Sequence, residues 1–228
     1  MIHSRKVTAL VPMKANSERV KNKNIRPFCG KPLYHHILQT LDKTYAIDEI
    51  IINTDSDQIA AEAPTLSKKI KIHIRPEAIR GDFVSMNRII EDDISRGETD
   101  IVLQTHSTNP LLRSESITKA LKAFVENEEK DSLFSVNVYQ SRFYGADGKA
   151  VNHNPEELLR TQDLPPLYEE NSNIYIFTKE SFAKKQRRIG ENPVLFPTPW
   201  IESIDIDNEY TFRLAELLAG YAAHLETD

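Results

Sequence analysis

The chain has 228 residues, of which 39% are hydrophobic and 28% are charged, and its formal net charge is -5. This balance is typical of one folded domain and excludes a disordered or fibrous chain, while the negative charge argues against a general nucleic-acid binder. Cys29 is the single cysteine, so an intrachain disulfide and a multi-cysteine metal site are both excluded.

The sequence shows no feature of a membrane or exported protein. No apolar run is long enough to span a bilayer. Residues 1–6 are mostly polar, where a signal peptide would have an apolar core. We therefore expect a cytoplasmic protein that has neither a membrane partner nor a nucleic-acid partner.

Short apolar runs alternate with amphipathic stretches along the chain. In chain order the patterns predict a strand at residues 7–13, a helix at 33–41, a strand at 49–53, a helix at 57–63, a strand at 71–74, a helix at 85–95, a strand at 101–104, a helix at 114–127, a strand at 132–138, a strand at 174–177, a late strand at 201–206 and a closing helix at 209–224. Ser85 and Ser114 are the expected N-caps of their helices. This order predicts an α/β fold of three layers, with a mostly parallel central sheet and helices on both faces.

The regular pattern is interrupted at about residues 139–170. This stretch contains Gly145, Gly148, Pro155 and the pair Pro165-Pro166 among polar residues, without a steady period. We interpret it as an inserted loop, lid or dimerisation arm within a single domain that covers residues 1–228.

The loop after the first strand is strongly basic. In open α/β sheets, ligands bind beyond the carboxyl ends of the strands, and a triphosphate needs such a concentration of positive charge. A solvated surface loop is the alternative interpretation. Between residues 14 and 26 a single acid, Glu18, faces five basic residues: Lys14, Arg19, Lys21, Lys23 and Arg26.

The segment VPMKANSERVKNKN at residues 11–24, followed by FCGKPL at 28–33, resembles the N-terminal signature of the acylneuraminate cytidylyltransferases. The resemblance implies that Ser17 contacts phosphate and that Lys23 and Asn24 contact phosphate and nucleotide. Lys14 stands where an arginine is usual, which keeps the charge but loses the two-pronged hydrogen bonding of a guanidinium. Ala15 and Asn16 replace the usual glycines, and we expect Asn16 to supply the left-handed turn.

Two further segments resemble motifs of the same family. In residues 75–87 the resemblance assigns Arg75 and Ser85 to the cytidine end, although Arg75 could simply close a strand and Ser85 simply cap a helix. Residues 103–113 resemble the segment that faces both nucleotide and sugar. An alignment on Pro110 places Thr108 and Asn109 against the nucleotide, and it leaves Gln104 and His106 as alternative sugar contacts.

Asp205 and Asp207 end the predicted late strand. Residues at i and i+2 of a strand point to the same face, and paired carboxylates suit Mg²⁺, which also takes phosphate oxygens and waters. An isolated Asp-x-Asp is weak on its own, but the run ESIDID at residues 202–207 resembles the family's aspartate motif.

The sugar end rests on partial matches. Gln162, Asn171 and Tyr175 are the polar or aromatic contacts that the resemblance implies. Glu169 and Glu170 would repel the carboxylate of an acidic sugar unless they face solvent, or they would bind an amino group on an unusual sugar.

The resemblance implies a Rossmann-like nucleotidyltransferase fold, a homodimer, and a Mg²⁺-dependent reaction of CTP with a sialic acid-like 2-keto-3-deoxy sugar acid. Lys14, Lys23 and Asp207 are the expected catalytic residues. The alternatives are a metal-dependent glycosyltransferase that uses the Asp-x-Asp pair and a catalytically degenerate nucleotide-binding protein. The expected site residues are Lys14, Ala15, Asn16, Ser17, Lys23, Asn24, Arg75, Ser85, Thr108 and Asn109 for the nucleotide, Gln104, His106, Gln162, Asn171 and Tyr175 for the sugar, and Asp205 and Asp207 for the metal.

Overall fold

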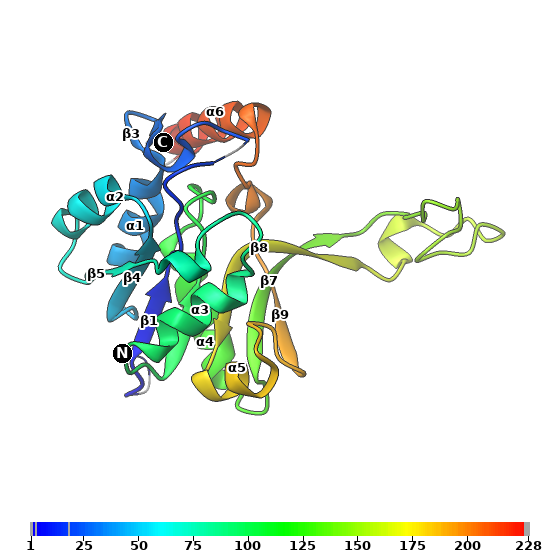
Figure 1. The fold of residues 1–228 in the computed structure, drawn as a ribbon. Helices are drawn as coiled ribbons and strands as arrows, with labels where there is room; N and C mark the ends of the chain where they lie inside the picture. Colours follow the sequence, from blue (N-terminus) through cyan, green and yellow to red (C-terminus); the bar gives the residue numbers. More distant parts are fainter. Residues whose placement is uncertain (1, 3, 18, 226–228) are drawn as a thin grey trace.

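The computed structural model describes residues 2, 4–17 and 19–225, with side chains as far as residue 221 (Figure 1). Its centre is a seven-stranded sheet in the order β5-β4-β1-β6-β8-β7-β9. The strands β5, β4, β1 and β6 are parallel to one another, β9 is parallel to β7, and β8 is antiparallel to both β6 and β7. The strands are β1 (Val7–Leu10), β4 (Glu49–Thr54), β5 (Ile70–Ile74), β6 (Ile101–Gln104), β7 (Ser132–Tyr139), β8 (Leu167–Phe177) and β9 (Pro193–Pro197).

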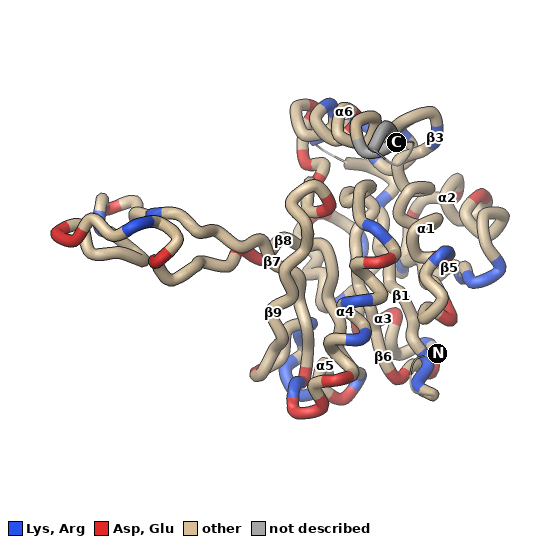
Figure 2. The backbone as a smooth tube through the Cα atoms, turned by 180° about the vertical axis from the view of Figure 1, so that it is seen from behind, with Lys and Arg blue, Asp and Glu red and all other residues tan. Residues whose placement is uncertain are grey.

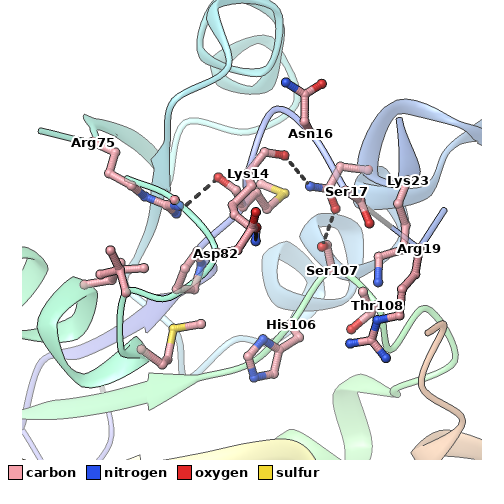
Figure 3. A pocket seen from close by; sticks show the side chains of 17 residues that line it. Lys14, Asn16, Ser17, Arg19, Lys23, Arg75, Asp82, His106, Ser107 and Thr108 are labelled. Atoms are coloured by element: carbon pink, nitrogen blue, oxygen red, sulfur yellow. Dashed lines mark hydrogen bonds and ion pairs between the residues drawn. The ribbon is translucent and has the colours of Figure 1, made fainter. Parts of the chain in front are cut away.

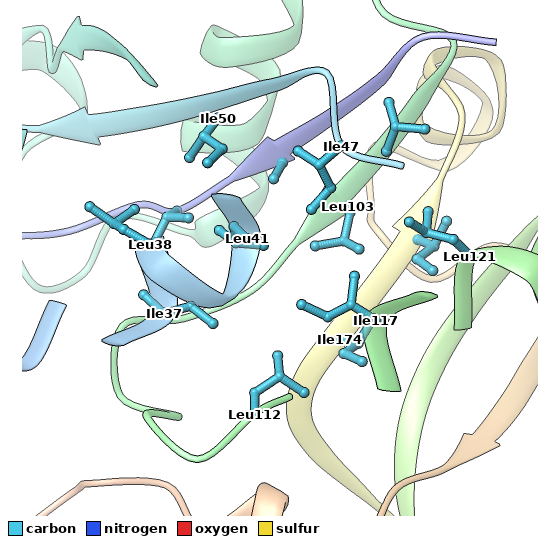
Figure 4. Close-up of a cluster of buried hydrophobic side chains, with 14 of the residues drawn as sticks. Ile37, Leu38, Leu41, Ile47, Ile50, Leu103, Leu112, Ile117, Leu121 and Ile174 are labelled. Atoms are coloured by element: carbon cyan, nitrogen blue, oxygen red, sulfur yellow. The ribbon is translucent and has the colours of Figure 1, made fainter. Parts of the chain in front are cut away.

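Helices cover both faces of this sheet, as the sequence predicted. The helices α1 (Leu33–Lys43), α2 (Asp57–Glu62) and α4 (Ser114–Glu126) pack on one face, and α3 (Met86–Ser95) and α5 (Lys179–Lys185) pack on the other. The two faces follow from the alternation of side chains along a strand. In β4, Ile50 and Ile52 join the larger core beneath α1 (Figure 4), while Ile51 joins the smaller core beneath α3.

The last helix, α6 (Glu209–Leu225), closes the top of the domain over a small hairpin. The hairpin strands are β2 (Pro27–Phe28) and β3 (Lys31–Pro32), and Cys29 and Gly30 between them both have positive φ, as a two-residue type I′ turn requires. Phe28 packs edge-on against Phe212 of α6 in a third apolar cluster. This cluster fixes the loop after β1 beneath the C-terminal helix.

Residues 140–166 leave the body of the domain as an arm. β7 and β8 pair up to Tyr139 and Leu167, and the chain beyond them extends far from the sheet (Figures 1 and 2). Leu158 on the arm is 88% exposed and Tyr144 is 57% exposed. Residues 140–166 lie within the insertion predicted at 139–170, whereas residue 139 ends β7 and residues 167–170 begin β8.

The prediction of a late strand at residues 201–206 is wrong. They form a short 3-10 helix, η5 (Trp200–Ser203), and then irregular chain. The alternation of isoleucine with polar residues imitated a strand, but the N–H of Ile206 bonds the carbonyl of Thr108 (2.9 Å), and its side chain joins the cluster under α6. Because Asp205 and Asp207 are not on a strand, the argument that they share one face of it does not hold.

Other boundaries differ in smaller ways. The first strand ends at Leu10, since Pro12 cannot donate to a ladder. Ser85 caps α3 as expected, accepting from the N–H of Asn87, whereas Ser114 is the first residue of α4 and Arg113 is its N-cap. Sequence analysis predicted neither the helix α5 nor the strand β9. The remaining 3-10 helices are η1 (Lys23–Ile25), η2 (Ala63–Thr65), η3 (Glu77–Ile79) and η4 (Thr161–Asp163).

Within the described residues, none of the helices has the length and apolar character needed to cross a membrane.

Candidate active site

A cleft of about 430 Å³ opens beyond the carboxyl ends of β1 and β6 (Figure 3). Its walls come from the basic loop after β1, from residues 81–84 before α3, and from residues 106–108 after β6. The cleft therefore lies at the edge of the sheet where an open α/β fold binds its ligands. Of the expected site residues, it is lined by Lys14, Asn16, Ser17, Lys23, Asn24, Arg75, His106 and Thr108.

Asn24 holds the basic loop in shape. Its side-chain amide donates to the carbonyl of Lys14 at 2.8 Å, and its oxygen accepts from the hydroxyl of Ser107 at 2.7 Å. The side chain is buried, so it joins the loop after β1 to the segment after β6 inside the protein. The left-handed residue of this loop is Asn22 (φ 54°) and not Asn16, which is exposed and has ordinary φ.

Lys23 lies where the basic loop meets the segment before α6. Its Nζ donates to the carbonyl of Ile206 at 2.7 Å. Burial lowers the pKa of Lys23, and the neighbouring carboxylates of Asp205 and Asp207 oppose that shift. A partly desolvated ammonium of this kind binds an anion more strongly than one in free solution.

Lys14 points into the cleft, where it forms an ion pair with Asp82 across the opening. The next residue, Ala15, gives its N–H to the carboxylate of Asp55 at 2.7 Å. The amide of Ala15 is thus engaged by the protein itself, and Lys14 is balanced by a carboxylate in this state.

Arg75 is almost fully buried, with 1% of its surface exposed. Its guanidinium donates to the side chain and carbonyl of Asn53 (2.8 Å each) and to the carbonyl of Met13 (3.2 Å). Burial lowers its pKa. Arg75 therefore fixes the chain just after β1 from within the protein, and it also belongs to the lining of the cleft. Ser85 lies outside the cleft and caps α3.

Asp205 and Asp207 flank Lys23 from the segment before α6. Oδ1 of Asp205 is buried and has no hydrogen-bond partner among the described residues, although its carboxylate also accepts from Thr108. Burial raises the pKa of Asp205, and the nearby Asp207 raises it further. Asp207 forms an ion pair with Arg19 at 3.0 Å. In the described part of the chain no three His, Cys, Asp or Glu side chains gather as a metal cluster, so this pair could supply only part of a ligand set.

Gln104 and His106 lie in one hydrogen-bonded chain with Arg188, a residue that sequence analysis missed. Nη1 of Arg188 donates to Oε1 of Gln104 at 2.6 Å, and Nε2 of Gln104 lies 3.0 Å from Nε2 of His106. Because a guanidinium only donates, the oxygen of Gln104 must face Arg188, and its amide must donate to His106. His106 therefore carries its proton on Nδ1.

Burial, with Arg188 and then Lys23 as neighbouring cations, lowers the pKa of His106 to about 3. The ring is consequently neutral at physiological pH. Since His106 lines the cleft, the cleft borders a neutral imidazole that carries its proton on Nδ1.

The remaining predicted residues fall in different places. Tyr175 pairs with Gln104 across the β6–β8 ladder, and both side chains are buried outside the lining of the cleft. The amide of Asn171 bonds Asn137 (3.1 Å) and Thr198 (2.8 Å) in a buried network at the base of the arm. Asn109 is fully buried, and Gln162 is exposed on the arm in η4.

Solved structures with the same architecture support an α/β nucleotidyltransferase fold. The structure of CMP:2-keto-3-deoxy-manno-octonic acid synthetase complexed with CTP superposes with a TM-score of 0.70, covering 95% of this chain and 99% of that chain at 14% identity. At this identity the likeness concerns the fold alone.

Two curated bacterial relatives match over nearly their whole length. Pseudaminic acid cytidylyltransferase of Campylobacter jejuni is 24% identical over 92% of this chain and 94% of its own. CMP-N,N'-diacetyllegionaminic acid synthase of Legionella pneumophila is 27% identical over 93% of this chain and 96% of its own.

The fold and the basic cleft define an enzyme of the nucleotidyltransferase class. The family model described as cytidylyltransferase matches residues 8–218, and the chain belongs to this family.

Proposed function

We propose that this protein transfers CMP from CTP to the anomeric hydroxyl of a 2-keto-3-deoxy sugar acid, a nine-carbon sialic acid-like sugar, and releases pyrophosphate. The observation that carries the proposal is the position of Lys23, which is bonded to Ile206 between two carboxylates at the end of a basic loop. The names of the relatives, which include pseudaminic and legionaminic acid enzymes, support the acidic sugar.

The chain has suitable groups for the triphosphate. Lys14, Ser17 and Lys23 line the cleft from one loop, and Asn24 keeps that loop in shape. The cytidine would lie towards Arg75, at the end of the cleft away from Lys23 (Figure 3). The proposed nucleotide-binding set is completed by Ala15, Asn16, Thr108, Asn109 and Ser85. Of these, Asn109 is buried and Ser85 caps α3, so these two would support the site by holding the local structure.

In the reaction, the anomeric oxygen forms a bond to the α-phosphorus, and the bond from that phosphorus to the bridging oxygen breaks, so that pyrophosphate carries away the electron pair. The hydroxyl proton is lost to solvent or to a carboxylate. Negative charge grows on the phosphate oxygens during this exchange, and Lys23, with Lys14, would stabilise it.

Asp205 and Asp207 fit a divalent cation. Among the described residues, the buried Oδ1 of Asp205 has no hydrogen-bond partner, so it is available to coordinate a cation. Mg²⁺ prefers oxygen ligands of this kind. A bound Mg²⁺ would supply charge neutralisation for the triphosphate. Arg19 would have to release Asp207 when the ion binds.

The sugar acid would lie beyond His106, towards Gln104 and Tyr175. Asn171 supports this side from the base of the arm. Gln162 is on the arm itself, so it could reach an acceptor only in the cleft of a second copy. The exposed apolar side chains of the arm, such as Leu158, are suited to contact that copy, and the proposal includes a homodimer.

The test is pyrophosphate release with each of CTP, UTP, GTP and ATP, combined with N-acetylneuraminic, pseudaminic, legionaminic and 2-keto-3-deoxyoctonic acids. The proposal predicts release that requires CTP, a divalent cation and one of the acids together. CTP binding without release for any acid would overturn it and would favour a protein that only binds the nucleotide.

A further inference from the structure

A second recess of about 430 Å³ adjoins the nucleotide cleft. Ser85, Met86 and Asn87 line it from the start of α3, and residues 187–189 line it from the chain after α5. Met86 lines both cavities, so the two are neighbours. A reaction between two substrates, a nucleotide and a sugar acid, needs two adjoining spaces of this kind.

Arg188 stands at the boundary of this recess, and its side chain is 19% exposed. Its guanidinium stacks on the ring of Tyr175, with 3.6 Å between the guanidinium carbon and the ring centroid. Stacking of this kind fixes the plane of the guanidinium and leaves its edge free to bind.

The partners of Arg188 do not use all of its donors. A guanidinium has five N–H groups. Nη1 donates to Gln104 at 2.6 Å, and Nη2 lies 3.5 Å from Oε1 of Glu170, which is longer than a good hydrogen bond. Glu170 also accepts from the hydroxyl of Tyr175. Arg188 is therefore held in place, and within the described part of the chain its polar contacts leave several N–H donors for a ligand.

Arg188 and Lys23 both lower the pKa of His106, so the imidazole lies within the field of both cations. Arg188 lines the recess and Lys23 lines the nucleotide cleft. Each of the two adjoining spaces therefore has its own positive group.

We propose that Arg188 binds the carboxylate of the acceptor sugar acid and selects 2-keto acids over neutral sugars. In a cyclic 2-keto acid the carboxylate and the anomeric hydroxyl are on the same carbon. An ion pair at Arg188 would therefore orient that hydroxyl towards His106 and the α-phosphate. Bidentate pairing of arginine with a carboxylate gives this geometric control, which a lysine does not.

This inference rests on the proposed function and adds a residue that chooses its substrate. The test uses the sugar acid with the highest turnover and its methyl ester, which lacks the negative charge. The variants are Arg188→Gln and Arg188→Lys. Lys184→Gln, which removes one charge from the exposed surface of α5, is the matched control.

Arg188→Gln should lower kcat/KM for the acid about 10–100-fold, the usual effect of losing a hydrogen bond to a charged group. The KM for CTP should not change. The acid should be strongly preferred to the ester by the wild type and by Lys184→Gln, and this preference should collapse in Arg188→Gln. Arg188→Lys should restore part of it.

An unchanged preference for the acid in Arg188→Gln would overturn the inference, as would an equal loss for acid and ester. If the wild type releases no pyrophosphate with any acid, the proposed function fails, and calorimetric binding of N-acetylneuraminic acid to CTP-saturated protein then decides about the site. If the wild type binds the acid and Arg188→Gln abolishes this binding, Arg188 holds the carboxylate even though no catalysis follows. If the wild type does not bind the acid, or if Arg188→Gln binds it equally well, the inference is overturned.

Discussion

The side-chain nitrogen of Lys23 lies 2.7 Å from the carbonyl oxygen of Ile206, although the two residues are 183 positions apart. This bond joins the loop after β1 to the segment before α6. Because Asp205 and Asp207 stand on either side of Ile206 in the sequence, this hydrogen bond ties the proposed phosphate-binding residue to the segment that carries the proposed metal ligands. The two halves of the site are therefore expected to respond together to mutation.

Lys23→Ala should weaken CTP binding about 10–100-fold, because it removes a charged donor from the phosphates. Titration calorimetry measures the affinity directly. Lys21→Ala, which removes an exposed lysine of the same loop, is the control and should have little effect. Equal affinity in Lys23→Ala and wild type would remove the loop from the nucleotide site.

Asp207→Asn should reduce metal-dependent turnover about 100-fold or more, as expected when a group that stabilises the transition-state charge is lost. CTP binding should partly survive, since Lys14 and Lys23 remain. Pyrophosphate release over a Mg²⁺ titration checks this. Arg19→Ala is the control, because it breaks the ion pair with Asp207 but leaves the carboxylate of Asp207 in place. If Arg19→Ala lowers turnover as much as Asp207→Asn does, Asp207 acts through this ion pair and not as a metal ligand.

Asp205→Asn should stabilise the protein while it abolishes turnover. Burial raises the pKa of Asp205, so the folded protein holds that proton more tightly than the unfolded chain. Ionisation of Asp205 therefore costs stability, and the loss develops as the pH rises through the folded-state pKa. Asparagine cannot ionise and avoids the loss.

The rise in Tm should amount to about 2–4 °C for each kcal/mol recovered. Calorimetric scans in a chelator, from about pH 8 down to about pH 4, should show the difference between variant and wild type shrink as the wild-type carboxyl becomes protonated. A difference that grows on acidification would contradict the assigned shift.

His106→Asn should keep most of the activity, and His106→Leu should lose it. An asparagine amide places an N–H donor where Nδ1 of the histidine carries its proton, whereas leucine offers none. Since the pKa of His106 is lowered to about 3, its titration should be missing from the pH profile of kcat/KM between about pH 5 and 8. Equal activity of the two variants would show that the donor is not used.

Local patterns carried enough information for the architecture and for the contiguous motifs. Lys23 and Asn24 are adjacent in one basic loop that follows an apolar strand, so their common location could be predicted. The late strand failed for a physical reason. Alternation of Ile204 and Ile206 with carboxylates satisfies the strand period, but these side chains instead pack under α6.

Arg188 could not be found in this way. It is 84 positions from Gln104 in sequence, and only the antiparallel pairing of β6 with β8, followed by α5, brings the two together. Nothing in the residues around it distinguishes it from Arg187. The position of Gln162 on a projecting arm could not be predicted either. Glycines and prolines indicate that a segment is inserted, but they do not show in which direction it leaves the domain.

The pairing of β7 with β8 shifts register between Phe134 and Val136, and Ser172 opposite this shift has a left-handed φ of 55°. Five positions separate Glu170 from Tyr175, which in a regular strand would place them on opposite faces. The bulge brings Glu170 to the hydroxyl of Tyr175. Deleting one residue here would turn over every side chain of β8 on the arm side of the deletion. A length change at this point would therefore rotate the surface that the arm presents to a neighbour and would also move Glu170 away from Tyr175 and Arg188. The orientation of the arm and the sugar side of the site are therefore linked through this one bulge.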